Sequence, residues 1–392
     1  MLALHFGAGN IGKGFIGYLL NKTGYDVCFV DVDQEAIDRF NETNRYHVEL
    51  LDDAETTETV SPVSALNSLN QQEEVINRIQ HADVITTSIG VHNLHRIAGT
   101  LANALLQRIT WNHNKLDIIA NENAINASST LQAEVEKHVS PEEMEEILSL
   151  VSFPNASVDR LALSKEGADY ETALVEPFYE WVINEKEMGN HDLPPIYGAT
   201  YVNDLKPFIE RKLFLVNMGH ATTAYIAFLY EEPTIQSALE NPDIETFVRG
   251  TMHESAQYFV ENFDVSQDEM NDYIEKIINR FKNKNISDNI FRVGRAPLRK
   301  LGQNERLSKP TQELRRSGLP TEHLTVAIAA GFLFDNPEDE ESVKLQNLIE
   351  ERGIEKAIVH VTGLENDDIC QAIQNNYTKL KEKNDLLSIV NQ

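Results

Sequence analysis

The sequence predicts an α/β domain with added antiparallel strands, followed by a mostly α-helical domain. Three observations support this prediction. Short apolar runs alternate with helix-forming segments up to about residue 150, as in a parallel sheet covered by helices. Residues 151–183 are rich in aromatic and β-branched residues, which favour strands. Nearly every later segment has helical character, so we divide the chain into residues 1–203 and 204–392.

Length and charge narrow the possible functions. The 392 residues exceed the roughly 250–300 at which a single core stops growing, which fits two domains. A net charge of −28 disfavours nucleic acid or an anionic membrane as the main partner, so an anionic ligand needs a local basic cluster. The chain is compatible with a monomer or a dimer.

The sequence also indicates a compartment. Its two cysteines, Cys28 and Cys370, suggest neither a disulfide framework nor a cysteine zinc site, which fits a reducing compartment. We find no secretory signal and no apolar run of the roughly 20 residues that span a membrane. We therefore expect a soluble, cytoplasmic protein.

The first segments read as strand, glycine-rich turn, helix and strand. An apolar strand at residues 2–6 precedes a GxGxxG motif, a helix follows from residue 15 and ends near Gly24, and a second strand covers residues 25–30. This context predicts a Rossmann-type dinucleotide site, with a pyrophosphate at the N–H groups of the helix start. A glycine turn without a ligand is the alternative. The motif consists of Gly7, Ala8, Gly9, Asn10, Ile11 and Gly12.

The residue at the end of the second strand predicts the cofactor. Asp31 is placed to accept hydrogen bonds from the adenosine ribose and to repel a 2′-phosphate, so we expect NAD rather than NADP. Asp33 is an alternative, but it lies past the strand end and is less well placed.

The remaining segments of the first domain follow in order. We expect a helix at 34–40, a hairpin at 46–60, a further strand and helix at 63–68 and 73–79, a strand at 82–88, a helix at 93–106, a strand at 116–120, and helices at 129–138 and 142–150. Ser88 and Gly90 lie where one strand ends, at a loop beside which the nicotinamide half of the cofactor could pass. The polar residues 121–126 follow the next strand, at the edge where open α/β sheets bind ligands. An ordinary capping loop is the alternative there.

The second half begins with extended segments and continues with helices. Residues 152–160 and 170–183 are expected to extend the main sheet as partly antiparallel strands, and residues 184–197 to form a loop. The helices after residue 203 should break near Pro233, Pro242, Asp264, residues 283–288, Gly302, Pro310, residues 318–320 and Gly363.

A segment in the helical half, residues 211–225, combines polar groups with an apolar background. We predict that it begins a mostly buried helix. With about 100° per residue, Lys212, Asn217 and His220 lie at about 0°, 140° and 80°, on one arc of the helix. Three polar groups on one side of an apolar helix indicate a polar pocket. A helix start with a solvated lysine and a capped histidine is the alternative.

Residues 292–316 concentrate positive charge in an acidic chain. They carry eight basic residues against Glu305 and Glu313. Arginine binds phosphate and carboxylate through two parallel hydrogen bonds, so the segment indicates an anion-binding site. The alternative is a patch that neutralises acidic helices or forms a subunit contact.

Together, these motifs resemble the polyol-specific long-chain dehydrogenases/reductases over essentially the whole chain. The resemblance rests on Lys212-x4-Asn217-x2-His220, the opening HFGAGNIGKGFIG, NENAINAS at 121–128 and VGRAPLRKLG at 293–302. It implies a metal-independent, NAD-dependent enzyme that interconverts D-mannitol 1-phosphate and D-fructose 6-phosphate. A related polyol or hexonate dehydrogenase is one alternative, and an NAD-binding redox sensor without turnover is another.

The resemblance also assigns roles to individual residues. Lys212 becomes the general base, Asn217 and Asn126 hold the reacting oxygen, and His220 orients the substrate. A lysine accepts a proton only in its neutral form, which desolvation favours, and an amide donor at a developing alkoxide can contribute roughly 3–4 kcal/mol. The expected substrate contacts are Asp159 and the pair Arg292 and Lys300; charge and location add Arg295 and Arg299 as the expected phosphate contacts.

Overall fold

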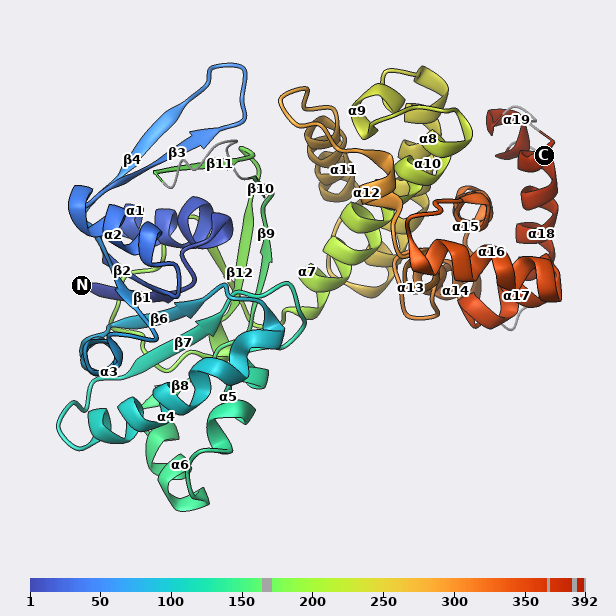
Figure 1. Ribbon diagram of the computed structural model, residues 1–392. Helices are drawn as coiled ribbons and strands as arrows, with labels where there is room; N and C mark the ends of the chain where they lie inside the picture. Colours follow the sequence, from blue (N-terminus) through green and yellow to red (C-terminus); the bar gives the residue numbers. More distant parts are fainter. Residues whose placement is uncertain (164–170, 365–366, 383–385, 391–392) are drawn as a thin grey trace. The chain divides into compact units, whose positions relative to one another are not determined.

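The computed structural model describes all residues except 164–170, 365–366, 383–385 and 391–392. The chain forms two compact units, Met1–Phe208 and Ile209–Gln392. Figure 1 shows strands and helices in the first unit and helices in the second. The domain boundary after residue 203 stays a prediction.

A six-stranded parallel sheet forms the centre of the first unit. Its strands run in the order β5-β2-β1-β6-β7-β8, which is 3-2-1-4-5-6 in order of occurrence. This order is typical of a doubly wound, dinucleotide-binding sheet, and it confirms the predicted fold class. The strands are β1 (Leu2–Phe6), β2 (Asp26–Asp31), β5 (Val63–Asn67), β6 (Val84–Thr87), β7 (Leu116–Ala120) and β8 (Val151–Ser152).

Helices cover both faces of this sheet, so its strands are apolar on both sides. Ala3 and Phe29 face the core that includes α1 and α2, whereas their neighbours Leu4 and Val30 face the core that includes α3, α4, α5 and α6. The helices are α1 (Tyr18–Thr23), α2 (Gln34–Thr43), α3 (Gln72–His81), α4 (Leu94–Ile109), α5 (Ala127–Glu136) and α6 (Pro141–Leu148).

Two smaller sheets correct one prediction. We expected the segment after residue 151 to extend the main sheet, but only β8 does so. Pro154 follows two residues later and has no N–H group for the ladder, so the chain leaves the sheet there. The four-stranded sheet contains β10 (Ala162–Leu163), β11 (Thr172–Val175), β3 (Tyr46–Leu50) and β4 (Thr57–Val60), and the three-stranded sheet contains β13 (Ala199–Val202), β12 (Glu180–Asn184) and β9 (Ala156–Asp159). Tyr170, the first residue of one predicted strand, lies outside the described residues.

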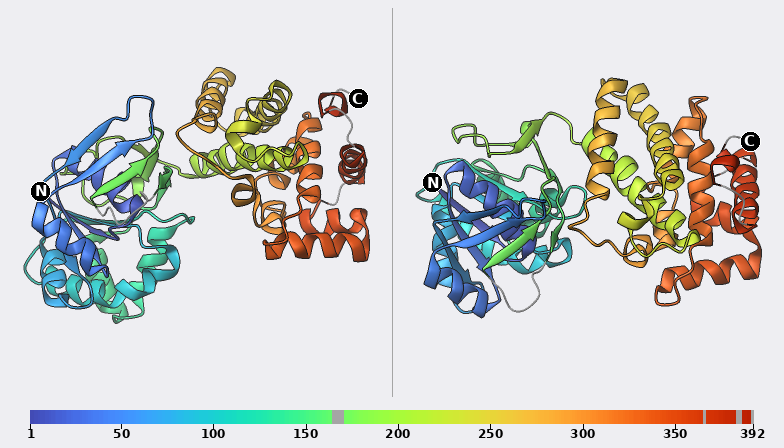
Figure 2. Two further views of the ribbon diagram at one scale, coloured as in Figure 1. Left: turned by 45° about the horizontal axis from the view of Figure 1, so that its top comes forward. Right: turned by 90° about the horizontal axis from the view of Figure 1, so that it is seen from above.

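The second unit is built around two helices, α8 (Met218–Leu229) and α15 (Glu322–Leu333), that are buried along nearly their whole length. They pack against each other and against α10 (Pro242–Asn262), as expected of helices that are apolar on all sides. Figure 2 shows this unit from two further directions. The other helices are α9 (Ile235–Ala238), α11 (Gln267–Phe281), α12 (Ile290–Gly294), α13 (Pro297–Lys300), α14 (Ser308–Arg316), α16 (Glu340–Arg352), α17 (Ile354–Thr362), α18 (Asp367–Lys381) and α19 (Leu386–Val390).

One predicted helix break is wrong. Pro310 is the third residue of α14 rather than a break between helices. N–H groups in the first turn of a helix have no acceptor within the helix, so a proline there removes no hydrogen bond. In the described part of the chain, no helix is long and apolar enough to cross a membrane.

Candidate cofactor site and active site

The glycine-rich loop follows β1 and leads into a π-helical turn, η1 (Gly12–Gly17). Gly7 has a φ of +105°, and a side chain at Gly12 would overlap the Gly7 carbonyl oxygen, so both positions need glycine. A Cβ added at Gly9 would meet no atom within 4 Å. The loop therefore offers its backbone at Gly9 for close approach, as a pyrophosphate requires.

The two rival aspartates have different surroundings. One Asp31 oxygen accepts from the N–H of Ala8 in the glycine loop, and the other accepts from the N–H groups that follow it, with Val32 at 2.7 Å. Asp33 caps α2 and accepts from the N–H groups of Glu35 and Ala36 at 3.1 and 3.2 Å. Both carboxylates thus accept hydrogen bonds from backbone N–H groups, and the choice of Asp31 for the ribose stays a prediction.

A buried histidine that the sequence analysis missed holds Ser88. The Nδ1 of His5 lies 2.6 Å from Thr86 Oγ1, and its Nε2 lies 2.8 Å from Ser88 Oγ. Burial lowers the pKa of His5 to about 3, so the ring is neutral at neutral pH. The sequence does contain a sign of this role, because His5 is a histidine inside an otherwise apolar strand.

A second missed residue, Glu122, fixes the loop after β6. This carboxylate is 5% exposed and accepts from Thr87 Oγ1 at 2.6 Å, Ile89 N at 3.0 Å and Gly90 N at 2.7 Å. It therefore orients the loop in which we predicted a cofactor contact at Gly90. Asn126, in the same polar segment, is exposed, has a φ of 55° and precedes α5.

Side chains from distant segments satisfy the carbonyl groups of η1. Arg160 is buried; its Nη1 donates to the Gly14 carbonyl at 2.9 Å, and its guanidinium lies 5.1 Å from the ring centroid of Tyr179. The Tyr46 hydroxyl donates to the Lys13 carbonyl at 2.7 Å. Arg160 therefore supports the turn of the cofactor loop, while its neighbour Asp159 ends β9, half-buried.

In the second unit, the segment with Lys212 is helical, but its geometry differs from the prediction. Helix α7 (Lys206–Arg211) passes into a second π-helical turn, η4 (Lys212–Asn217), which continues as α8. The arc calculated for an α-helix is therefore wrong. A π-helical turn is closed by hydrogen bonds five residues apart, so Lys212 and Asn217 lie closer to one line than in an α-helix.

A buried serine supports this turn. The Ser255 hydroxyl on α10 donates to the Phe214 carbonyl of η4 at 2.7 Å, and Ser255 is fully buried. Buried carbonyl groups need such partners, and a widened turn needs them from outside the helix. Both π-helical turns thus depend on contacts across the fold.

Replacing Ser255 by alanine should disturb η4. The Phe214 carbonyl would lose a partner, which we expect to cost about 1–3 kcal/mol in the free energy of unfolding and to lower kcat. Denaturant unfolding and steady-state kinetics would measure both effects. Thr251→Val is the matched control, because the Thr251 hydroxyl, also on α10, donates to the Phe247 carbonyl of its own helix. If kcat of the two variants is equal, Ser255 does not position the turn.

His220 is half-buried and contacts the buried Asp288, which the sequence analysis missed. His220 Nε2 lies 3.1 Å from Asp288 Oδ2, and the other Asp288 oxygen pairs with Arg292. The ring stacks on Phe281, with 4.8 Å between centroids. Burial lowers the pKa of His220, and the hydrogen bond to Asp288 opposes that effect.

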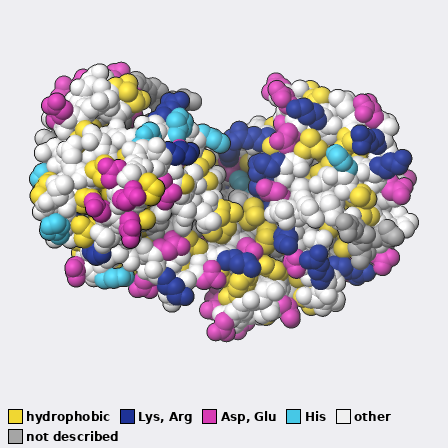
Figure 3. Space-filling model, turned by 90° about the horizontal axis from the view of Figure 1, so that it is seen from below, with side chains coloured by type: hydrophobic (Ala, Val, Ile, Leu, Met, Phe, Trp, Pro, Cys, Tyr) yellow, Lys and Arg dark blue, Asp and Glu magenta, His cyan; other side chains and the backbone are white. Residues whose placement is uncertain are grey.

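Seven of the eight basic residues of the segment form two groups, and the eighth, Arg292, pairs with Asp288. Lys309 and Arg316 pair with Glu313 at 2.7 and 2.9 Å, and Arg315 lies 3.6 Å from Asp368, so these three residues neutralise acidic helices, as the alternative interpretation expected. On the face in Figure 3, acidic side chains are spread widely and basic ones form small groups.

The other group surrounds Lys300. Lys300 is buried, and its Nζ donates to the Val293 carbonyl. Burial, and then the charges of Arg306, Arg299 and Arg295, lower its pKa to about 7. Arg306 is also buried and pairs with Glu305 at 3.1 Å, whereas Arg299 is exposed and lies 3.7 Å from Glu305. Four cations thus share one region of the second unit.

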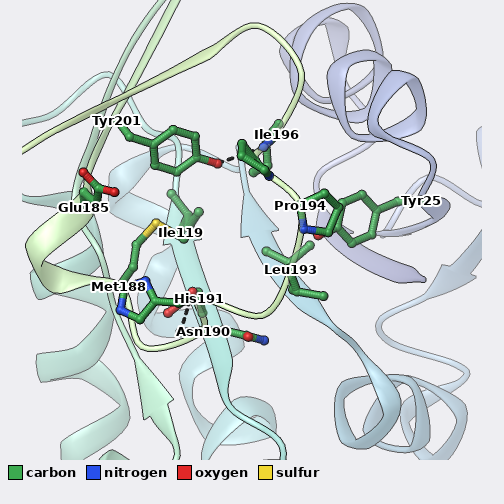
Figure 4. A pocket seen from close by; sticks show the side chains of 13 residues that line it. Tyr25, Ile119, Glu185, Met188, Asn190, His191, Leu193, Pro194, Ile196 and Tyr201 are labelled. Carbon is green, nitrogen blue, oxygen red and sulfur yellow. Dashed lines mark hydrogen bonds between the residues drawn. The ribbon is translucent and has the colours of Figure 1, made fainter.

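A cavity in the first unit lies away from the cofactor loop. It is found at the amino ends of β2, β6 and β7, opposite the edge that carries the glycines (Figure 4). Asp117 in its wall accepts from the N–H groups of Gly189 and Asn190 at 2.8 and 3.2 Å, and so fixes the covering loop to the sheet. These contacts give Asp117 a structural role. Among the described residues, no three His, Cys, Asp or Glu side chains are grouped as metal ligands.

Comparison with known proteins identifies matching family models and relatives of similar sequence. The family models for the mannitol dehydrogenase Rossmann domain and the mannitol dehydrogenase C-terminal domain match residues 1–195 and 204–381. The mannitol-1-phosphate 5-dehydrogenases of Bacillus licheniformis and Bacillus subtilis are both 43% identical to this chain. The first alignment covers 94% of this chain and 97% of the relative, and the second covers 95% and 98%.

Solved structures share the fold. Pseudomonas fluorescens mannitol 2-dehydrogenase, in a ternary complex with NAD and D-mannitol, matches with a TM-score of 0.73 and 18% identity, over 100% of this chain and 94% of that one. A substrate-free D-sorbitol dehydrogenase matches with a TM-score of 0.84 and 13% identity, over 97% of this chain and 93% of that one. At these identities, the likeness establishes the fold alone.

Proposed function

The chain belongs to the mannitol dehydrogenase family, and we propose that it interconverts D-mannitol 1-phosphate and D-fructose 6-phosphate with NAD as the hydride carrier. The observation that carries the proposal is the identity of about 43%, over nearly the whole length, to relatives named for this reaction. The cations around Lys300 support a phosphorylated substrate, because an acidic chain needs a local positive group to bind an anion.

We assign the chemical step to the residues that the sequence motifs identify. Lys212 takes the proton of the substrate hydroxyl, and the amides of Asn217 and Asn126 donate to the oxygen as it becomes an alkoxide and then a carbonyl. His220 and Arg292 orient the polyol chain, together with Lys300 and Asp159. Bound NAD would supply the acceptor for the hydride that leaves the carbon bearing the hydroxyl.

The residues of the first unit suit this cofactor. Gly7 and Gly9 allow a tight turn and the approach of the backbone to a pyrophosphate, Gly12 allows close packing at the helix start, and the helix starts at Asn10 and Ile11. We place the ribose at Asp31 beside Ala8, and the nicotinamide half beside Ser88 and Gly90, at the loop that Glu122 holds.

Absorbance of NADH tests the function directly. Purified protein with NAD would receive D-mannitol 1-phosphate, D-mannitol, D-sorbitol or a hexonate, and the reverse reaction would use D-fructose 6-phosphate or D-fructose. We expect the phosphorylated pair to react with by far the highest kcat/KM. Preference for an unphosphorylated polyol or a hexonate would favour the alternative dehydrogenases, and NAD binding without turnover would favour a redox sensor.

The role of Asp31 gives a prediction about cofactor choice. Asp31→Ser should lower the ratio of kcat/KM for NAD to that for NADP by about 10- to 150-fold, because a charged hydrogen bond contributes roughly 1.5–3 kcal/mol. Initial rates with each cofactor would measure this ratio. Asp33→Ser is the matched control, since serine can still cap α2 and should leave the ratio unchanged. A change only in the Asp33 variant would transfer the ribose role to Asp33.

A further inference from the structure

The surroundings of His220 determine which of its ring nitrogens can carry hydrogen. One ring face stacks on Phe281, and Nε2 lies 3.1 Å from Asp288 Oδ2. A carboxylate only accepts hydrogen bonds, so the hydrogen of a neutral imidazole must be on Nε2. Nδ1 then carries the lone pair. The His220 side chain is 26% exposed, so it is not sealed from ligands.

Asp288 is itself held firmly. Its N–H donates to Gln236 Oε1 at 3.0 Å, and its carbonyl accepts from Ile235 N at 2.9 Å. Its second carboxylate oxygen pairs with Arg292 one turn further along the chain. Burial raises the pKa of Asp288, but the hydrogen bonds and charges of His220 and Arg292 outweigh it and leave the pKa below its ordinary value. The carboxylate is therefore ionised at neutral pH.

We propose that Asp288 is a positioning residue that fixes His220 in the Nε2–H tautomer, so that Nδ1 accepts a hydrogen bond from a substrate hydroxyl. This inference rests on the proposed function. With this tautomer, the helical unit offers the substrate one hydrogen-bond donor and one acceptor. Asn217 donates to the reacting oxygen, and His220 accepts from a neighbouring hydroxyl. The same carboxylate holds Arg292, so one buried acid orients two substrate-binding side chains.

The tautomer can be measured on the wild-type protein. Nitrogen-15 NMR of histidine-labelled protein, with the His220 signals identified by their loss in His220→Phe, should show hydrogen on Nε2 and an unprotonated Nδ1 near neutral pH. Asp288→Asn can turn its amide group toward Nε2, so we expect part or all of the hydrogen to move to Nδ1. A wild-type ring with its hydrogen on Nδ1 would overturn the proposal, whatever the variants do.

Kinetics test whether Asp288 acts through His220. We expect Asp288→Asn to lower kcat/KM for D-fructose 6-phosphate by about 10- to 150-fold with the KM for NADH unchanged. In the His220→Phe background, the same change should lower it less, by only the part that acts through Arg292, because contacting residues that act together are not additive. Equal losses in both backgrounds would reject the proposal.

The helical unit offers a matched control. Glu254 is another buried carboxylate beside a histidine, with Oε1 2.8 Å from His323 Nδ1. Glu254→Gln should change stability but leave kcat/KM unchanged; a loss as large as that of Asp288→Asn would make the Asp288 effect one of general stability. The proposed function fails separately, if wild-type protein does not reduce D-fructose 6-phosphate at all.

Discussion

Replacing Lys212 by alanine should lower kcat by about 10²- to 10⁴-fold, the range that a general base contributes, while substrate and NAD still bind. Oxidation of the polyol requires the hydroxyl proton to leave as the hydride leaves carbon. We place the general base at Lys212 of η4, whereas Asn217 carries a neutral amide and His220 is proposed to accept a hydrogen bond from a neighbouring hydroxyl. Steady-state kinetics and equilibrium binding of NADH would measure the two effects.

A matched variant and a chelator give this prediction its controls. Lys206→Ala, at the start of α7, should behave as wild type. Chelators should leave activity intact. Activity that is lost on chelation and restored by zinc would contradict the proposed mechanism.

The main sheet could be predicted because its information is local. Each of its longer strands is a short apolar run, and the glycine motif identifies the first βα turn. In the smaller sheets the hairpin expected at residues 46–60 is confirmed as β3 and β4, but the pairing of distant strands could not be predicted in the same way. Thr172 of β11 pairs with His47 of β3, far earlier in the chain, and strand propensity does not specify such a partner.

The contacts within the candidate site could also be predicted only where they depend on local sequence. The π-helical turn at Lys212 depends on Ser255, on another helix, so a fixed α-helical period places Asn217 at the wrong angle. Glu122 and Asp288 acquire their roles from partners distant in sequence, and a single acidic residue in a polar segment gives no sign of them. Motif residues were identifiable; the residues that hold them were not.

The second large effect should come from the phosphate contacts. Charged hydrogen bonds contribute roughly 1.5–3 kcal/mol each, so Arg295→Ala should raise the KM for D-fructose 6-phosphate by about 10- to 150-fold. Arg299→Ala should have a smaller effect, because Glu305 already lies 3.7 Å from that guanidinium.

The pKa of Lys300, about 7, predicts a pH effect on substrate binding. A bound phosphate dianion favours the charged form of Lys300, so the affinity for the phosphorylated substrate should fall as the pH rises above 7.

The decisive comparison uses two ketoses that differ by the phosphate. For each variant, kcat/KM would be measured with D-fructose 6-phosphate and with D-fructose. The ratio of the two losses in kcat/KM gives the contribution of the phosphate contact. Arg295→Ala should lose activity with the phosphorylated ketose and little with fructose, which we expect to be a poor substrate. Arg316→Ala is the matched control, since Arg316 pairs with Glu313 at 2.9 Å and belongs to the neutralising group. Equal losses on both ketoses would mean that the cations around Lys300 are structural and that the phosphate binds elsewhere.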